Sequence, residues 1–325
     1  MIEIAEFLPP TPSPLWKLAS QAGVQHAVGG LPFDDPENGS DAPWDLAPLT
    51  RMQQRYNAAG FELAVIEARP PLNLAKRGLD GRDAEIDTVC TLLEHMGKLG
   101  IPVWCYEWMT DFNWLRTTFD TPSRGGSVVT SYSHAEMQSR PPSEHGPISE
   151  EALWEHLHYF LERVIPVAEA SGVKLAMHPD DPPISPIRGV GRIMRSVENF
   201  QRLLDLVPGP MNGITMCQGN FTLMTDDLPS VIRRFGHQGK IFFVHFRDVR
   251  GTPEQFEETW HDAGKTDMLA CMRAYREIGF RGVLRPDHVP TVEGDSNSNA
   301  GYSSFGRLYA LGYIRGLREA VYGAD

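Results

Sequence analysis

Four side chains of metal-binding types stand where apolar runs end in the second half of the chain. They are His178 in "LAMHPDDPP", Cys217 in "ITMCQGN", His245 in "FFVHFRD" and Asp287 in "VLRPDHVP". A lone histidine in an apolar strand is more often a satisfied core group, and a lone buried cysteine usually packs. Four such residues at the ends of successive predicted strands favour a shared site, because the carboxyl ends of parallel barrel strands meet at one rim.

The donor types narrow the choice of metal. Two imidazoles, a thiolate and a carboxylate suit Mn2+, Fe2+, Co2+ or Zn2+. The thiolate disfavours Mg2+ and Ca2+, which prefer oxygen ligands. The sequence therefore predicts a divalent transition metal held by His178, Cys217, His245 and Asp287.

Eight apolar or β-branched runs predict the strands that would position these ligands. The runs are Ile2–Phe7, His26–Gly30, Leu63–Ala68, Pro102–Trp108, Val173–Pro179, Gly213–Gly219, Ile241–Asp248 and Gly282–His288. Helix-like segments lie between most of them, and this alternation indicates a parallel sheet. We predict an α/β fold, a (β/α)8 TIM barrel forming a single domain over residues 1–325. An open doubly wound sheet is the alternative, but no GxGxxG or P-loop follows the first strand.

Two helices and two loops can be placed with some detail. Apolar spacing predicts a helix over 83–99, and Ser149 is the expected N-cap of a helix that runs to about residue 170. Long loops follow the fourth and fifth strands, over 109–147 and 180–195. Because barrel enzymes build their sites from loops at the carboxyl ends of strands, we expect both to be lids over a pocket.

Composition limits the partners and the compartment. The formal net charge of -12 argues against a nucleic-acid or anionic-membrane surface, although it is equally typical of plain solubility. The sequence contains no apolar run of about 18 residues and no signal-peptide pattern, and the four cysteines form no CxxC pair. We therefore expect a cytoplasmic protein with no membrane partner and a small-molecule substrate. Homo-oligomerisation is left open.

Several motifs together resemble those of the mannonate dehydratases, a family of sugar-acid enzymes with a xylose-isomerase-like barrel. The motifs are "CYEWMTDFNWLRT", "MHPDDPP", "MCQGNF", "HFRDV", "HDAGKTDM", "LRPDHVP" and "GYSSFGRLYALGYIRGL", and the likeness runs from about Phe61 to Leu317. The first sixty residues depart from the family pattern, with "EFLPPTPSP" and "HAVGGLPFDDPENG" in place of its usual first strand ends. The distal part of the substrate pocket is therefore not defined by the resemblance.

The resemblance implies a reaction, a cofactor and catalytic residues. It implies dehydration of D-mannonate, or of a closely related aldonate, to 2-keto-3-deoxy-D-gluconate. It implies Mn2+ or Fe2+ on the four ligands above, and it places the catalytic histidine and tyrosine on His288 and Tyr302. Loss of water from a 2,3-dihydroxy acid requires removal of the C2 proton and protonation of the leaving 3-hydroxyl, and these two side chains are suited to that exchange. The alternative for His288 is to support the metal ligands from behind or to cap the loop, and the alternative for Tyr302 is a structural tyrosine at the start of a helix.

Four further residues are predicted to contact the substrate. Arg285 and Arg247 lie beside ligands in sequence and are suited to clamp a carboxylate, with rim ion pairs as the alternative. Asp180 and His261 are further candidates; the alternative for Asp180 is again an ion pair at the rim, and the alternative for His261 is a structural role in a lid.

Two other functions on the same barrel are kept open. The first is a metal-dependent sugar isomerase or epimerase, which the thiolate ligand disfavours because such an enzyme is expected to use mainly carboxylates. The second is a non-catalytic sugar-acid-binding homologue, which is expected to have lost His288 or Tyr302, although both are present.

Overall fold

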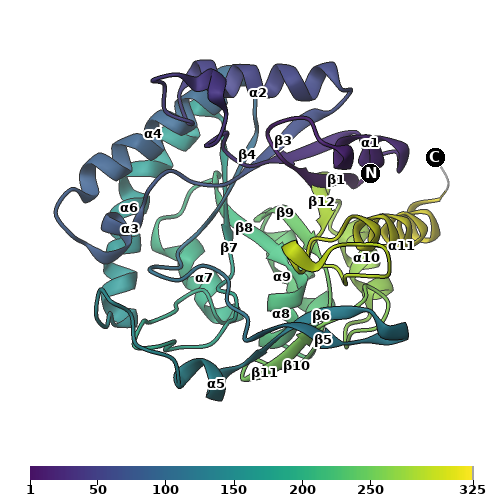
Figure 1. Ribbon diagram of the computed structural model, residues 1–325. Helices are drawn as coiled ribbons and strands as arrows, with labels where there is room; N and C mark the ends of the chain where they lie inside the picture. The colour runs from purple at the N-terminus through teal and green to yellow at the C-terminus, as the bar shows by residue number, and fades with distance from the viewer. Residues whose placement is uncertain (324–325) are drawn as a thin grey trace.

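A closed barrel of eight parallel strands forms the centre of the computed structural model, which describes residues 1–323 (Figure 1). Its strands are β1 (Glu3–Leu8), β2 (His26–Gly29), β3 (Glu62–Glu67), β4 (Val103–Glu107), β7 (Lys174–His178), β8 (Asn212–Cys217), β9 (Ile241–Phe246) and β12 (Val283–Pro286). Each pairs with the next barrel strand in chain order, and β12 closes the barrel against β1. All eight predicted strands and the TIM-barrel class are confirmed.

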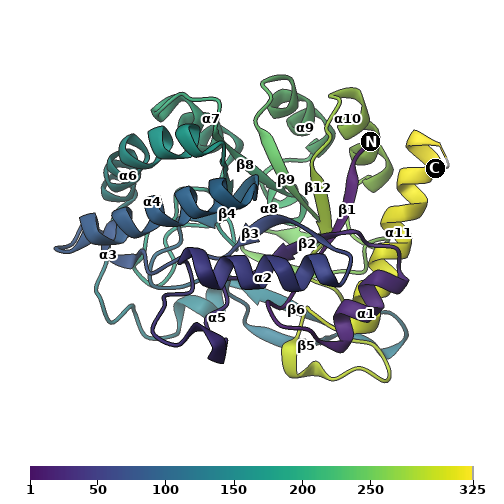
Figure 2. The ribbon, with the colours of Figure 1, turned by 90° about the horizontal axis from the view of Figure 1, so that it is seen from above.

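Helices surround the barrel, as Figures 1 and 2 show. The helices of the outer layer and its connections are α1 (Pro14–Gln21), α2 (Leu46–Ala58), α3 (Asn73–Arg77), α4 (Arg82–Leu99), α6 (Glu150–Ser171), α7 (Val197–Leu206), α8 (Gln218–Met224), α9 (Leu228–His237), α10 (Met268–Glu277) and α11 (Ser304–Tyr322). Helices α4 and α6 confirm the two predicted in detail, and the hydroxyl of Ser149 accepts from the amide of Ala152 as the expected N-cap. None of the helices in residues 1–323 is long and apolar enough to cross a membrane.

Two apolar layers hold the strands in place. Residues such as Val65, Cys105 and Phe243 fill the barrel interior, whereas a larger cluster packs between the strands and the helices. Strand β9 is buried on both faces, which explains its continuous apolar sequence. The interior side chains support the floor of the site at the carboxyl ends of the strands.

The loop predicted over 109–147 contains structure that the sequence did not reveal. It holds β5 (Thr118–Pro122), β6 (Val128–Ser133) and the short helix α5 (His134–Gln138). These strands join β10 (Val249–Thr252) and β11 (Gln255–Glu258) in a four-stranded antiparallel sheet of order β10-β11-β6-β5. Figure 1 shows this small sheet at the side of the barrel. The prediction that the whole segment is a loop was wrong, because β6 pairs with a strand more than 100 residues away in sequence. Met109, Asn113 and Trp114 of the segment line the cavity at the carboxyl ends of the barrel strands.

Candidate metal centre and active site

A cavity of about 470 Å³ opens at the carboxyl ends of the barrel strands. Side chains from β3, β4, β7, β9 and β12 line it, together with residues of the loops that follow. His178, His245, Asp287, His288 and Tyr302 are all in this lining. The barrel therefore brings most of the predicted ligand and catalytic residues to one cavity.

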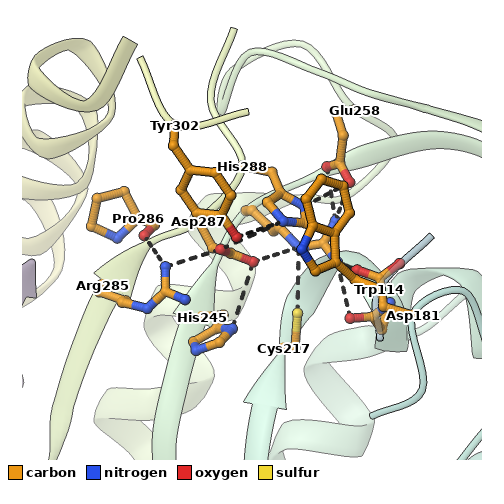
Figure 3. Close-up of polar contacts among 12 residues, drawn as sticks. Trp114, Asp181, Cys217, His245, Glu258, Arg285, Pro286, Asp287, His288 and Tyr302 are labelled. Carbon is orange, nitrogen blue, oxygen red and sulfur yellow. Dashed lines mark hydrogen bonds and ion pairs between the residues drawn. The ribbon is translucent and has the colours of Figure 1, made fainter. Parts of the chain in front are cut away.

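The four predicted metal ligands lie together at the cavity floor. One donor atom each from His178, Cys217 and His245 fall within 4.8 Å of one another. Nε2 of His178 lies 3.2 Å from Nδ1 of His245, and Oδ2 of Asp287 lies 3.5 Å from that same Nδ1. Cys217 is fully buried beneath this group (Figure 3). The grouped donors are two nitrogens and a sulfur, with the carboxylate of Asp287 beside them, and these donor types suit a divalent transition metal.

Neighbouring acceptors orient both imidazoles. The carbonyl of Pro179 lies 2.7 Å from Nδ1 of His178 and accepts its hydrogen bond. The lone pair of Nε2 of His178 therefore faces the other ligands and is available to a metal. Oε1 of Glu67 lies 3.3 Å from Nε2 of His245, which leaves Nδ1 of His245 directed toward Asp287. Each histidine thus presents one nitrogen to the metal position.

The electrostatics of the ligand group favour a bound cation. Burial raises the pKa of the Cys217 thiol, but the Arg247 guanidinium and His178 outweigh burial and hold that pKa well below its ordinary value. Burial and Arg285 lower the pKa of His245, whereas Glu67 and Asp287 raise it, and the net effect is a pKa of about 10. The Cys217 thiolate and the Asp287 carboxylate together stabilise a nearby positive charge. A metal ion can supply that charge in place of the extra proton on His245.

Two other clusters of potential ligands are already neutralised by arginines. Glu67, with Cys105 and His245, forms one cluster, but its carboxylate accepts from Arg285 at 2.7 and 2.9 Å. Asp181 and Glu258 form the other with His288, and Arg116 and Arg247 hold both carboxylates. Arginines also contact the cluster at Cys217, but that cluster combines a thiolate with two imidazoles, and these donor types suit a transition metal best.

His288 and Tyr302 form a hydrogen-bonded pair beside the ligand Asp287. Nε2 of His288 lies 3.0 Å from the hydroxyl of Tyr302, and the two rings meet edge to face. The backbone of His288 has φ +34°, in the left-handed region that residues other than glycine rarely adopt. This breaks the alternation of a strand, in which successive side chains point to opposite faces. Consecutive residues 287 and 288 can therefore both face the cavity.

Arg247 links the metal ligands to the carboxylates around His288. Its Nε lies 3.4 Å from Sγ of Cys217 and 3.0 Å from Oδ2 of Asp287. Its Nη1 donates to both oxygens of Glu258, and its Nη2 donates to Asp181 and Asn220. All five donors of a guanidinium are thus directed to protein acceptors.

A glycine makes room for this arginine. A Cβ at residue 219 would lie 2.7 Å from Cζ of Arg247, closer than carbon atoms pack without a shift. The glycine of the "MCQGN" stretch therefore lets α8 begin directly against the guanidinium.

The four residues predicted to contact the substrate differ in whether they line the cavity. Arg285 lines the cavity, and it donates to Glu67 and Asp287. Arg247, Asp180 and His261 are buried and are not in the lining. Asp180 accepts from the Met194 amide at 2.7 Å, and burial lowers the pKa of His261 to about 4.

The structure adds Glu67, Arg116 and Glu258, which the sequence did not single out, and it places Asp181 and Trp114 at the same site. Glu67, Asp181 and Trp114 line the cavity, and Trp114 lies with its ring centroid 5.1 Å from that of His288. Arg116 and Glu258 come from the segments that build the small sheet and reach the same cluster. A hairpin signal in "VRGTPEQFEE" was available for the strand that carries Glu258, but the facing partner in residues 128–133 was not.

The fold first defines a class, the xylose-isomerase-like TIM barrels. A xylose isomerase domain protein from Planctomyces limnophilus matches with a TM-score of 0.65 at 14% identity, covering 99% of each chain. D-psicose 3-epimerase from Clostridium cellulolyticum matches with a TM-score of 0.63 at 13% identity. At such low identity these likenesses concern the fold alone.

Closer relatives define the family within that class. The family model of D-mannonate dehydratase (UxuA) matches residues 15–145 and 143–324. A mannonate dehydratase of Thermotoga neapolitana is 35% identical over 92% of this chain and 91% of its own length, and mannonate dehydratase 2 of Halalkalibacterium halodurans is 35% identical over 86% and 88%. The crystal structure of mannonate dehydratase from Streptococcus suis matches with a TM-score of 0.90 at 32% identity, covering 98% of this chain and 93% of that one. The chain belongs to the mannonate dehydratase family, a family of hydro-lyases.

Proposed function

We propose that this protein is a metal-dependent dehydratase that converts D-mannonate to 2-keto-3-deoxy-D-gluconate and water. The observation that carries the proposal is the proximity of two groups in one cavity: a transition-metal ligand set, and a hydrogen-bonded histidine–tyrosine pair beside its carboxylate ligand. Membership of the mannonate dehydratase family supports the substrate, and the cavity of about 470 Å³ is large enough for a six-carbon acid.

We propose Mn2+ or Fe2+ as the cofactor, held by His178, Cys217, His245 and Asp287. When bound, the divalent ion supplies positive charge for the substrate carboxylate and for the negative charge that develops as the C2 proton leaves. The protein contributes the thiolate, which Arg247 stabilises, and imidazoles that Pro179 and Glu67 orient.

The proposed chemistry divides proton transfer between His288 and Tyr302. One of them takes the C2 proton of the acid, and the other delivers a proton to the departing 3-hydroxyl, so that water leaves and an enol remains. The enol then takes a proton at C3 and loses the proton of its C2 hydroxyl, which gives the keto acid. Their 3.0 Å hydrogen bond allows the proton to pass from one side chain to the other and restores the starting state. Trp114 also lines the cavity and packs against His288, with the ring centroids 5.1 Å apart.

Direct assay of an aldonate panel tests this function. The metal-loaded protein should form a 2-keto-3-deoxy acid from D-mannonate faster than from other aldonates with hydroxyls at C2 and C3. Isomer or epimer formation without a keto acid would favour the isomerase alternative.

Three further expectations stay predictions: a single domain over residues 1–325, a cytoplasmic location and homo-oligomerisation. The one closed barrel supports a single domain. The free cysteines, with Cys217 as a proposed thiolate ligand, support a reducing compartment such as the cytoplasm.

A further inference from the structure

Glu258 reaches the proposed proton-transfer pair from outside the barrel. It is the last residue of β11, and its Oε1 lies 3.0 Å from Nδ1 of His288. On the other side of the ring, Nε2 lies 3.0 Å from the hydroxyl of Tyr302. Figure 3 shows the carboxylate, the imidazole and the phenol in sequence above the metal ligands. We propose that Glu258 is a positioning residue that fixes the orientation and tautomer of His288, an inference that rests on the proposed function.

The small sheet explains why this glutamate points inward. Strand β11 alternates exposed and buried positions, and Phe256 and Glu258 are the buried ones. Phe256 pairs with Tyr132 of β6, and their rings lie 5.7 Å apart. Because side chains two residues apart share one face of a strand, packing of Phe256 directs Glu258 toward the barrel. The small antiparallel sheet, which was not predicted from the sequence, thus positions Glu258 beside His288.

Competition for the hydrogens of Arg116 favours one donor in the contact between Glu258 and His288. Nη2 of Arg116 carries two hydrogens, and three acceptors lie around it: Oε1 of Glu258, Oδ2 of Asp181 at 3.1 Å and Nδ1 of His288 at 3.2 Å. Ionised carboxylates accept hydrogen bonds more strongly than a neutral imidazole does. We therefore infer that Nδ1 keeps its own hydrogen and donates it to Glu258.

The charge state of Glu258 agrees with this assignment. Burial raises the pKa of the carboxyl, but the positive charges of Arg247 and Arg116, together with the hydrogen bond from His288, outweigh burial and hold that pKa below its ordinary value. An ionised carboxylate only accepts hydrogen bonds. With the hydrogen on Nδ1, Nε2 is left as the basic atom and accepts from the hydroxyl of Tyr302.

The consequence for the reaction is a defined proton path. The proton that His288 gains binds at Nε2, and the positive charge that then spreads over the ring lies beside the Glu258 carboxylate, which stays unprotonated. The proton leaves again from Nε2, so no proton is gained or lost by Glu258. Loss of this carboxylate should slow turnover without weakening metal or substrate binding.

A purely structural role would be charge balance for the two arginines. Asp181 provides the comparison, because its carboxylate also accepts from Arg116 and Arg247 and is equally buried, with 2% of each side chain exposed. No hydrogen bond joins Asp181 to the ring of His288 within the described residues. Glu258→Gln and Asp181→Asn therefore remove the same charge from the same arginines but differ in the contact with His288.

Turnover measured in the wild-type and His288→Asn proteins distinguishes a positioning role of Glu258 from charge balance alone. Glu258→Gln should lower kcat by about 10- to 100-fold with KM and metal content unchanged, and by less than about 3-fold when His288 is already Asn. Asp181→Asn should cost the same factor in both backgrounds. Glu258→Asp keeps the charge but shortens the reach, so it should fold and still lose kcat by about 10-fold. An equal cost of Glu258→Gln in both backgrounds, or wild-type kcat in Glu258→Asp, would overturn the proposal.

A spectroscopic measurement tests the proposal without turnover. Nitrogen-15 NMR of the imidazoles in the Zn2+-loaded protein, with His288 assigned through His288→Asn among the 11 histidines, reports which ring nitrogen carries the hydrogen. The proposal requires hydrogen on Nδ1, and hydrogen on Nε2 alone would refute it. If the wild type dehydrates no aldonate, the proposed function fails, while this measurement still decides the role of Glu258.

Discussion

Asp287 and His288 are consecutive in the chain, yet both side chains line the same cavity. In the proposed function Asp287 is a metal ligand and His288 transfers a proton, so a single peptide unit separates the two proposed roles. The left-handed backbone at His288, with φ +34°, makes this possible. Strain of this kind persists where the surrounding structure over-determines it, as it does at many active sites.

Metal content should depend on the thiolate. The purified protein is expected to hold about one divalent transition ion per chain, because donor atoms of His178, Cys217 and His245 lie within 4.8 Å of one another and Asp287 lies beside His245. Cys217→Ser should lower occupancy, and His178→Ala and His245→Ala should lower it further. Metal analysis of protein prepared under reducing, chelator-free conditions measures this. Cys271→Ser is the matched control, since Cys271 is equally buried but lies in α10. Full occupancy in all three ligand variants would exclude the site.

Activity should be sensitive to oxidants and to chelators. Only a thiolate binds the metal, so oxidation of Cys217 removes a ligand. Turnover is expected to fall in air or after chelation, and to return with a reductant plus Mn2+ or Fe2+. Activity that is indifferent to both treatments would contradict a thiolate–metal centre.

Removal of either proton-transfer group should spare binding. His288→Asn and Tyr302→Phe are expected to lower kcat by about two to four orders of magnitude, the usual contribution of a general acid or base. Metal content and aldonate affinity should stay close to wild type, because neither side chain belongs to the proposed ligand set. Calorimetric titration with D-mannonate alongside the kinetics distinguishes this from a loss of binding, which would assign both residues to the substrate pocket instead.

A buried lysine beside the cavity should make stability depend on pH. Burial lowers the pKa of Lys76 from its ordinary 10.5 to about 7, even though Glu107 opposes the change. Between these two pKa values the unfolded chain binds more protons than the folded chain, so this group makes stability rise with pH. Relative to Lys76→Met, the wild type should gain on the order of 2 kcal/mol between about pH 7 and about pH 9.

Urea unfolding of both proteins at equal metal loading measures that difference. The exposed Lys98 on α4 provides the control, since Lys98→Met should leave the pH dependence unchanged. A Lys76→Met variant whose pH dependence matches that of the wild type would show that Lys76 keeps its ordinary pKa in the folded chain.

The barrel could be predicted from the sequence because its signals are local. Apolar runs such as 241–248 and a capped helix at Ser149 are visible within a few residues, and strand ends fix where His178 and His245 must lie. The ligand set followed from that rim alone, before any family was considered. Resemblance was needed for His288 and Tyr302, because their pairing depends on a left-handed residue and a loop between residues 288 and 302.

The rest of the site depends on contacts between distant segments. Strand β5 is largely exposed and β6 is only partly buried, and both are stabilised by pairing within a sheet whose other half follows β9. Nothing near residue 116 or 258 indicates that an arginine and a glutamate 142 residues apart form a buried ion pair beside His288. The predicted arginine clamp at Arg247 illustrates the same limit, since its five donors are occupied by partners from four different segments.

The most direct test of the account is dehydration of D-mannonate in deuterated water. The account predicts 2-keto-3-deoxy-D-gluconate that carries one solvent-derived deuterium at C3, because the C2 proton is removed, water leaves, and the enol is protonated at C3 from solvent-exchanged groups. Mass spectrometry and proton NMR of the product measure both features. If D-mannonate binds to the metal-loaded protein but no keto acid forms, or if the keto acid carries no deuterium at C3, the proposed mechanism is contradicted.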